Sequence, residues 1–209
     1  MLVCTRTYRF RMYLALVLAA VMHATCQALC FRARPVIRYH ACMMSHALSP
    51  ALADRAEPNP AGARVLVERA TWRDLPALAR LQRRAFPPPL AYTLPTLIIL
   101  RLIPWVRTLL VRRDRQIAGC VIGDRVLEGG RVVNLAVDPA YRRQGIGRAL
   151  LAAIERELDT PVMMLMVQQE NAGARQLYLS AGYEEEVELP NYYGAGRMGV
   201  RMRKTRSRA

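Results

Sequence analysis

Hydrophobic and polar residues follow their most regular pattern between positions 131 and 182. Unbroken runs of β-branched and aliphatic residues predict two buried strands, and apolar residues at intervals of three and four predict two helices. Gly182 follows the second helical pattern and is a common residue for a helix C-terminal cap. In chain order these elements are a strand at Arg131–Val137, a helix at Gly147–Leu158, a strand at Pro161–Val167 and a helix at Asn171–Ala181.

Weaker patterns on either side complete the predicted order of elements. Thr71 and Asp74 provide side chains that begin a helix, Pro76 fits its first turn, and Pro87–Pro89 ends it. Strands and helices interleaved in this order, without an internal repeat, predict an α/β (α+β) fold. The further elements are an opening strand at Arg64–Glu68, helices at Leu75–Leu81 and Leu97–Leu102, a hairpin of Thr108–Arg112 and Gln116–Gly123, and closing strands at Tyr183–Leu189 and Met198–Arg203.

Residues 1–62 differ in composition from the rest of the chain. All three histidines and four of the five cysteines precede Asp54, and Met12–Phe31 contains no Asp, Glu, Lys or Arg. Three arginines come before this apolar stretch, as in a targeting peptide, and about 20 mostly apolar residues also suffice for a membrane anchor. A third interpretation, which we favour, is that the working protein begins near Met43. The sequence leaves open whether residues 1–53 are present in it.

The formal net charge of +15 at pH 7 is concentrated at the two ends of the chain. Residues 1–53 contain six arginines and no acid, and residues 201–209 contain five basic residues and no acid, whereas the two signs nearly balance in between. A folded domain that binds the phosphates of a nucleic acid would itself carry the positive charge. Specific nucleic-acid binding is therefore not predicted. Only Cys120 lies within the domain, and Cys26 with Cys30 lacks the second ligand pair of a zinc site, so neither a disulfide scaffold nor a metal is predicted.

The candidate chemistry lies in the turn before the helix at Gly147–Leu158. Arg142-Arg143-Gln144-Gly145-Ile146-Gly147 occupies this turn, and Arg148 follows it. A helix N-terminus presents unpaired N–H groups and a positive dipole end, and glycines let a pyrophosphate approach that backbone closely. A dinucleotide fingerprint is not matched, because Leu150 stands where its third glycine belongs. A nucleoside-triphosphate loop needs a lysine, and no lysine precedes Lys204.

This turn resembles motif A of the GNAT superfamily of N-acetyltransferases, whose Arg/Gln-x-x-Gly-x-Gly/Ala pattern is filled by Arg142-x-x-Gly145-x-Gly147. A second stretch, Asn171–Tyr183, is similar to the family's Asn-x-x-Ala-x-x-Leu-Tyr-x-x-x-Gly-Phe segment. The resemblance implies a GNAT domain over residues 63–204, followed by a basic tail at 205–209. It also implies a mostly antiparallel mixed sheet, flanked by helices, that splays between two parallel strands.

The resemblance further implies acetyl-CoA as co-substrate and roles for residues of both motifs. Backbone groups in the strand segment Leu135, Ala136 and Val137 would pair with the pantetheine arm as an added strand would. Asn171 would contact the same arm, and Tyr178 would protonate the departing CoA thiolate. The residues implied to hold the pyrophosphate are Arg142, Arg143, Gln144, Gly145, Ile146, Gly147 and Arg148.

The sequence defines the acceptor side less well. Within the superfamily the chain is similar to the bacterial ribosomal-protein N-terminal alanine acetyltransferases, through Asn134–Pro139 and Tyr192-Tyr193. The resemblance puts that group's general base, a glutamate, at Met166, which cannot accept a proton. A base is dispensable if an α-amine, with a pKa near 7.7–8.0, arrives neutral. The substitutes considered, acting through a water, are Glu170, Glu184, Glu185, Glu186, Glu188 and Tyr192.

The resemblance implies an enzyme that moves acetyl from acetyl-CoA to an amine by direct transfer, with a protein or peptide N-terminus as the expected acceptor. A small-molecule amine is the alternative acceptor, and the missing glutamate keeps a non-catalytic acetyl-CoA-binding module open. Association with a membrane or nucleic acid through the basic ends ranks below these. A cytoplasmic location is expected from the intracellular cofactor, with membrane association only through residues 12–31. The sequence does not define the acceptor or the oligomeric state.

Overall fold

The computed structural model describes residues 57–58, 64–88 and 90–206. These residues lie in a compact unit that begins at Pro50. The apolar stretch Met12–Phe31 lies outside the described residues, so the three interpretations of the N-terminal extension stay predictions. Among the residues that are described, no helix is both long enough and apolar enough to span a bilayer.

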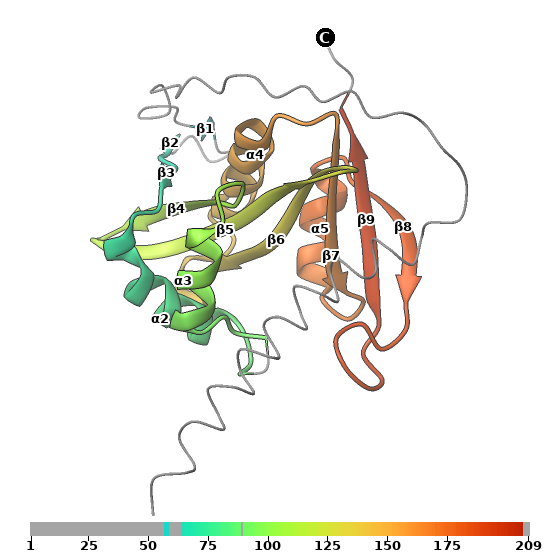
Figure 1. Ribbon diagram of the computed structural model, residues 1–209, viewed down its shortest axis with the longest axis horizontal. Helices are drawn as coiled ribbons and strands as arrows, with labels where there is room; N and C mark the ends of the chain where they lie inside the picture. Colours follow the sequence, from blue (N-terminus) through green and yellow to red (C-terminus); the bar gives the residue numbers. More distant parts are fainter. Residues whose placement is uncertain (1–56, 59–63, 89, 207–209) are drawn as a thin grey trace, which may run out of the picture. The chain divides into compact units, whose positions relative to one another are not determined.

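Seven strands of the described chain form one sheet with the order β3-β4-β5-β6-β7-β9-β8 (Figure 1). The β6–β7 pair is parallel, and the other pairs in this sheet are antiparallel. This confirms the predicted mixed and mostly antiparallel sheet. The strands are β3 (Glu68–Arg69), β4 (Arg107–Arg113), β5 (Gln116–Val126), β6 (Gly129–Val137), β7 (Val162–Gln168), β8 (Glu184–Leu189) and β9 (Gly199–Thr205).

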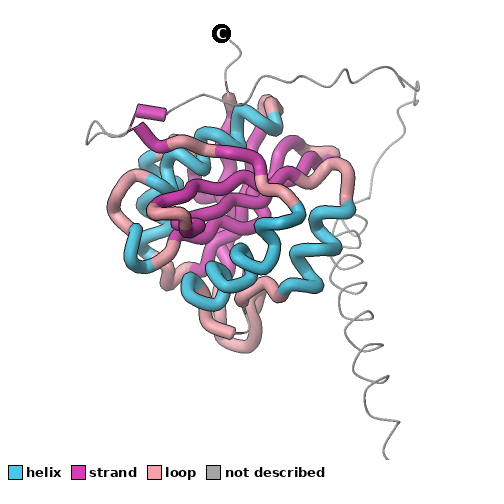
Figure 2. Tube along the Cα trace, turned by 90° about the vertical axis from the view of Figure 1, so that its left-hand side faces the viewer, coloured by secondary structure: helices cyan, strands magenta, loops and turns pink. Residues whose placement is uncertain are grey.

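Helices cover both faces of this sheet, as Figure 2 shows. One layer holds α2 and α3, and the opposite layer holds α4 and α5. β5 contributes to both cores, because Cys120 belongs to the core under α2 and Val121 to the core under α4. The uninterrupted apolar run in β5 therefore reflects burial on two faces. The helices are α2 (Leu75–Ala85), α3 (Leu94–Leu102), α4 (Ile146–Leu158) and α5 (Ala172–Ser180).

The start of α2 follows the predicted chemistry. Thr71 N–H donates to Asp74 Oδ2 at 2.8 Å, a 3-10 turn at Trp72–Asp74 leads into the helix, and Pro76 lies in its first turn. α2 continues to Ala85, four residues beyond its predicted end, and stops before the proline run. The residues that begin α2 were therefore predicted correctly from the sequence, whereas the predicted length of the helix was too short.

The predicted opening strand was wrong in one respect, because it is divided in two. Arg64–Val65 forms β2 and pairs with β1 (Glu57–Pro58), whereas β3 pairs with β4. The chain thus changes pairing partner, and one ladder cannot continue across the change. α3 begins at Leu94, three residues earlier than predicted, because the Thr93 side chain caps it. At the other end, β9 includes Thr205, the first residue of the predicted tail.

β6 and β7 diverge where β6 carries a β-bulge. Their parallel ladder covers three pairs and ends at Val132 and Leu165. On the other edge of β6 the register against β5 shifts between Ile122 and Gly123, so Val133 is an extra residue in β6. A bulge bends its strand and increases the local twist, which turns the rest of β6 away from β7. The predicted splay is present, and the apolar pattern gave no sign of the bulge.

Candidate acetyl-CoA and acceptor site

The divergence leaves one edge of β6 without a strand partner beyond Val132 in the described part of the chain. Asp138 N–H donates to Ala118 O of β5 at 2.9 Å, and backbone groups along a strand point alternately to opposite sides. The N–H and C=O groups of Leu135 and Val137 therefore face the gap, where an extended ligand can pair with them. Ala136 faces β5, opposite Cys120.

The turn between β6 and α4 has the backbone geometry of an anion site. Arg143 and Gly145 have positive φ angles of 63° and 77°. The bond from Ala149 N–H to Gly145 O, 3.0 Å long, closes the first turn of α4. The N–H groups of the first three helical residues therefore have no acceptor within the helix. Together with the positive end of the α4 dipole, these groups suit a pyrophosphate.

The two glycines of this turn, Gly145 and Gly147, have different structural roles. Gly145 adopts the left-handed conformation that other residues rarely adopt, so it shapes the turn itself. A Cβ on Gly147 would lie 3.2 Å from Leu177 Cδ2, so this glycine lets α4 and α5 approach each other closely. Ile146 between them is buried and anchors the turn in the core, while Gln144 is exposed. Gly145 is thus required by the backbone conformation of the turn, and Gly147 is required by the packing of α4 against α5.

Three arginines surround the turn, and none of them pairs with a carboxylate within the described residues. Arg142 donates from Nε to Val137 O and from Nη2 to Ala85 O, both at 3.4 Å, and so bridges the ends of β6 and α2. Arg148 donates to a serine hydroxyl of α5 at 2.9 Å, and Arg143 is exposed. Positive charge without carboxylate partners favours a phosphate-bearing ligand.

Asn171 is the N-cap of α5. Its Oδ1 accepts a hydrogen bond from Ala174 N–H at 3.1 Å. The Nδ2 amino group takes no part in this cap and remains a donor at the exposed start of the helix. The capping role and the predicted contact with a pantetheine arm therefore use different atoms of one side chain.

Tyr178 is held by the cap at the other end of α5. Tyr183 N–H donates to Tyr178 O and Gly182 N–H donates to Leu179 O, both at 3.0 Å, and Gly182 has a φ of 86°. This pattern is a Schellman cap, as Gly182 predicts, and it brings Tyr183 back onto the helix. The Tyr183 ring lies edge-on to the Tyr178 ring at 5.9 Å. Burial raises the pKa of Tyr178 to about 12, so its hydroxyl stays protonated at neutral pH.

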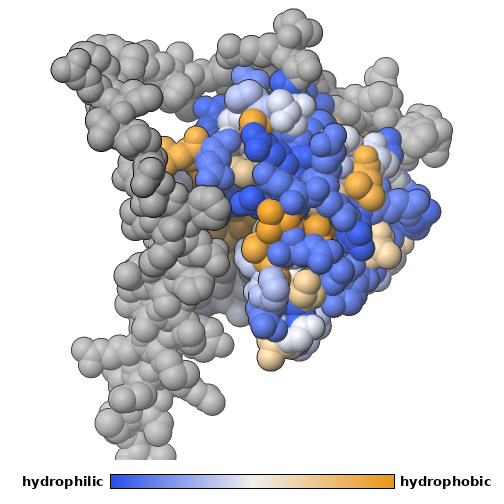
Figure 3. Space-filling model, turned by 90° about the vertical axis from the view of Figure 1, so that its right-hand side faces the viewer, coloured by the Kyte–Doolittle hydropathy of each residue, from blue (hydrophilic) through white to orange (hydrophobic). Residues whose placement is uncertain are grey.

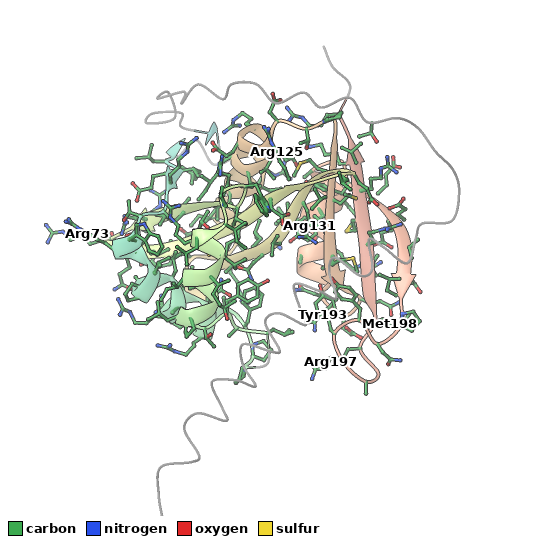
Figure 4. The ribbon with its side chains drawn as sticks, viewed as in Figure 1. Arg73, Arg125, Arg131, Tyr193, Arg197 and Met198 are labelled. Atoms are coloured by element: carbon green, nitrogen blue, oxygen red, sulfur yellow. The ribbon has the colours of Figure 1, made fainter. Side chains whose placement is uncertain are left out.

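Further aromatic side chains gather on the acceptor side. The rings of Tyr192 and Tyr193 lie edge-on to each other at 4.9 Å. Tyr178 and Tyr92 lie near Tyr193, and Arg131 lies near Tyr192. Tyr92 comes from the α2–α3 connection and the Tyr192-Tyr193 pair from the β8–β9 loop, so loops from both halves of the sheet converge. Figure 4 shows Arg131 and Tyr193 in the region between these halves. Burial raises the pKa of all three loop tyrosines, so they present neutral phenols.

Met166 lies at the place where the resemblance puts a base. It is on β7, opposite Arg201 of β9. A Cβ on Gly199 would lie 2.8 Å from Tyr192 Cβ and 3.1 Å from Met166 Cε, so Met166 and Tyr192 pack against the same glycine. This position therefore holds the thioether of Met166, and the phenol ring of Tyr192 lies near it.

The glutamates considered as substitutes lie mainly on β8, the edge strand that β9 separates from β7. This side of the molecule is largely hydrophilic (Figure 3), and Glu170 is exposed as well. In the described part of the chain no group of three His, Cys, Asp or Glu side chains is placed to hold a metal ion. The partners of the β8 glutamates are Arg175 for Glu185 at 2.7 Å, Arg201 for Glu186 at 2.9 Å and Gln169 for Glu188 at 3.4 Å.

A buried polar network that sequence reasoning missed holds the bulge. Gln82 of α2 donates from Nε2 to Asn134 Oδ1 at 2.8 Å, and its Oε1 accepts from Asn134 Nδ2 at 3.3 Å and from Tyr92 N–H at 3.4 Å. Beside it, Arg131 and Asp124 form a two-bond pair across β5 and β6, at 3.0 and 2.6 Å. The network ties the Tyr92 loop to β6. A glutamine on the apolar face of α2 was the signal that could have revealed it.

The family model described as an acetyltransferase (GNAT) domain matches residues 104–185. This match contains the open edge of β6, the glycine turn and Tyr178. This part of the chain is therefore similar to the GNAT acetyltransferases. The ribosomal protein bS18-alanine N-acetyltransferase of Escherichia coli is 39% identical over 84 residues, which are 39% of this chain and 57% of the relative. The match to these curated relatives thus spans a little more than half of their length.

Two further comparisons extend over most of the GNAT domain. An uncharacterized N-acetyltransferase of Methanocaldococcus jannaschii is 28% identical over 151 residues, covering 69% of this chain and 94% of the relative. The crystal structure of the ribosomal-protein-S18-alanine N-acetyltransferase from Escherichia coli has a TM-score of 0.61 and 29% identity, covering 69% of this chain and 96% of that one. The PaiA N-acetyltransferase of Thermoplasma acidophilum, solved with coenzyme A, shares the fold at 16% identity, 68% and 99% coverage and a TM-score of 0.58. The predicted GNAT fold is confirmed.

Proposed function

We propose that this protein transfers an acetyl group from acetyl-CoA to the α-amine of a protein or peptide N-terminus. The observation that carries the proposal is that three features border one gap in the sheet. These are the open backbone edge at Leu135 and Val137, the unpaired N–H groups at the start of α4, and Tyr178 on α5. In this arrangement the pantetheine arm pairs with β6 and the pyrophosphate lies at the glycine turn. The Escherichia coli relative, named for acetylating an N-terminal alanine, supports the acceptor class.

The proposed reaction is a direct transfer. The nitrogen lone pair of a neutral amine attacks the thioester carbonyl carbon, and the carbon–sulfur bond then breaks. The CoA thiolate takes a proton from the Tyr178 hydroxyl, and the new amide loses its extra N–H proton to solvent, from which Tyr178 is reprotonated. Because burial raises the pKa of Tyr178, its hydroxyl stays protonated at neutral pH and still carries the proton when the thiolate forms.

The methionine at position 166 supports a preference for α-amines over lysine side chains. A site without a carboxylate base depends on amine that arrives already neutral. At pH 7 roughly one-seventh of an α-amine is neutral, against about 0.04% of a lysine amine, because their pKa values are near 7.8 and 10.4. Loops carrying Tyr92, Tyr192 and Tyr193 would then hold the first residues of the acceptor chain.

Met166 also favours a second candidate, a module that binds acetyl-CoA without transferring its acetyl group. Both candidates require the same cofactor site, so cofactor binding does not separate them. Transfer in addition requires a bound acceptor and the proton of Tyr178. We further propose a cytoplasmic place of action, since acetyl-CoA is an intracellular cofactor.

The test is a CoA-release assay of the full chain with acetyl-CoA and a panel of amines. The panel holds peptides with free N-termini, the same peptides with blocked N-termini and internal lysines, and small polyamines. Release with free N-termini alone supports the proposal, and release with small amines alone shifts the acceptor class. Tight acetyl-CoA binding without release on any amine identifies the non-catalytic module.

A further inference from the structure

The layer formed by α3 and the start of α2 exposes large apolar side chains. Leu94, Ile98 and Leu102 are 37%, 38% and 65% exposed, and their spacing of four residues places them in one stripe along α3. Trp105 follows the helix at 58% exposure, and Trp72 precedes α2 at 50%. We call these five residues the α3 face. Large apolar side chains that are exposed together in this way mark an interaction surface.

Arginines surround the α3 face. The Arg101 guanidinium lies 5.5 Å from the centroid of the Trp72 ring, which links α3 to the start of α2. Arg73, Arg80 and Arg83 in the same layer are exposed and form no ion pair among the described residues, and Figure 4 shows Arg73 pointing outward. From position 69 to position 113 the sequence has nine arginines and a single acid, Asp74, which is buried and paired. Four of the nine, Arg69, Arg84, Arg107 and Arg112, pair with carboxylates. The positive charge near the stripe therefore comes from Arg73, Arg80, Arg83 and Arg101.

We propose that the α3 face docks on a lipid bilayer that carries anionic headgroups. Tryptophan side chains favour the boundary between headgroups and acyl chains, because one end of the ring system is apolar and the other is polar. Exposed aliphatic side chains gain from insertion at the same depth, while arginines nearby contact headgroup phosphates. The inference goes beyond the proposed acetyl transfer. It also departs from the sequence expectation that only residues 12–31 contact a membrane, since here the folded domain makes the contact.

Two other occupants fit the observations less well. A second copy using the same face would bring the two sets of arginines together without acids to neutralise them. A nucleic acid would neutralise the arginines but would leave Leu94, Ile98 and Leu102 in water, because its phosphates offer no apolar contact. A bilayer with anionic headgroups meets both the charge and the apolar stripe.

The two tryptophans of the 209-residue chain both lie on the α3 face, so tryptophan fluorescence reports on this surface alone. The full chain is titrated with vesicles of phosphatidylcholine containing phosphatidylglycerol, and with phosphatidylcholine vesicles as comparison. We expect a blue shift and quenching by brominated lipid with the anionic vesicles. Binding in sedimentation without any change in tryptophan emission would overturn the proposal, since the contact would then lie elsewhere, for instance at residues 12–31.

Matched variants test the apolar and the charged parts separately. Ile98→Ser with Leu102→Ser should abolish the blue shift, whereas Leu127→Ser with Leu179→Ser, at exposed positions in the β5–β6 turn and on α5, should keep it. Arg73→Gln with Arg80→Gln and Arg83→Gln should weaken binding to anionic vesicles roughly 100-fold, since each arginine near such a surface contributes about a fivefold gain.

Circular dichroism melting verifies that each variant is folded. Equal binding by both serine pairs would overturn the proposal. A face that drives concentration-dependent self-association, or that binds RNA more tightly than anionic vesicles, would overturn it as well.

Discussion

The proposed cofactor side and the proposed acceptor side of the gap differ in the groups that form them, which are backbone groups on the first and side chains on the second. On the proposed cofactor side, the backbone would supply the groups that hold the ligand, through the β6 edge, the Gly145 turn and the start of α4. On the proposed acceptor side, the groups would be side chains from two loops and from β7, among them Tyr92, Tyr193 and Met166. A backbone site depends on a few glycines and on the fold, whereas a side-chain site changes with each substitution. A backbone site of this kind can therefore be predicted from a sequence motif, whereas a side-chain site cannot.

Removing the Tyr178 hydroxyl should have the largest effect on activity, because the proposed proton transfer from Tyr178 joins the cofactor side to the acceptor side. Tyr178→Phe keeps the buried ring and removes the proton donor. We expect kcat to fall about 10²- to 10⁴-fold, with little change in acetyl-CoA affinity. Steady-state CoA release and calorimetric binding measure the two quantities. Tyr183→Phe, one ring away at 5.9 Å, is the control and should keep most of the activity.

The pH profile addresses the acceptor side alone. If no carboxylate serves as base, kcat/KM should rise about tenfold per pH unit up to the α-amine pKa near 7.7–8.0. Because the folded-state pKa of Tyr178 is raised to about 12, its proton is kept and this residue should cause no loss of activity below pH 10. Met166→Glu should raise kcat/KM at pH 6 by supplying a base. A wild-type profile that is flat from pH 6 to 8 would show that a base is already present.

Substituting the glycine of the turn addresses the cofactor side alone. Gly145→Ala forces alanine into a left-handed conformation that costs roughly 1–2 kcal/mol, so acetyl-CoA affinity should drop about 5- to 30-fold. Gly173→Ala in α5 is the matched control, because its Cβ meets nothing within 4 Å and the φ is ordinary. Calorimetric titration with acetyl-CoA measures both. Equal affinities in the two variants would remove the turn from the cofactor site.

The smallest expected effect concerns the link between the two sides. Gln82→Leu leaves the partly buried Asn134 amide without its partner and should lower the free energy of unfolding by about 1–3 kcal/mol. Adding Asn134→Leu should recover part of that loss, since both polar groups are then gone. Urea denaturation of the single and double variants measures this. A larger loss in the double variant would mean that the network is not a closed pair.

The sequence predicted most of the elements because they depend on local signals, and the residues of the glycine turn were proposed for the cofactor from a local motif. Gly145 and Gly182 each fix a positive φ at a helix end, and Thr71 with Asp74 begins α2. The bulge at Val133 escaped prediction, because it depends on the pairing of β5 with β6 and on Gln82 from a distant helix. The convergence of Tyr92 with the Tyr192-Tyr193 loop escaped for the same reason, since 100 residues separate them in sequence and only the fold brings them together.

The most direct test of the central claim is to locate the acetyl group after reaction. The full chain is incubated with acetyl-CoA and a peptide that has a free N-terminal alanine and an internal lysine, and tandem mass spectrometry maps the product. We predict acetylation of the α-amine, none on the lysine at pH 7, and strongly reduced product with Tyr178→Phe. Acetyl-CoA binding with no acetylated peptide, or equal product with Tyr178→Phe, would contradict the account.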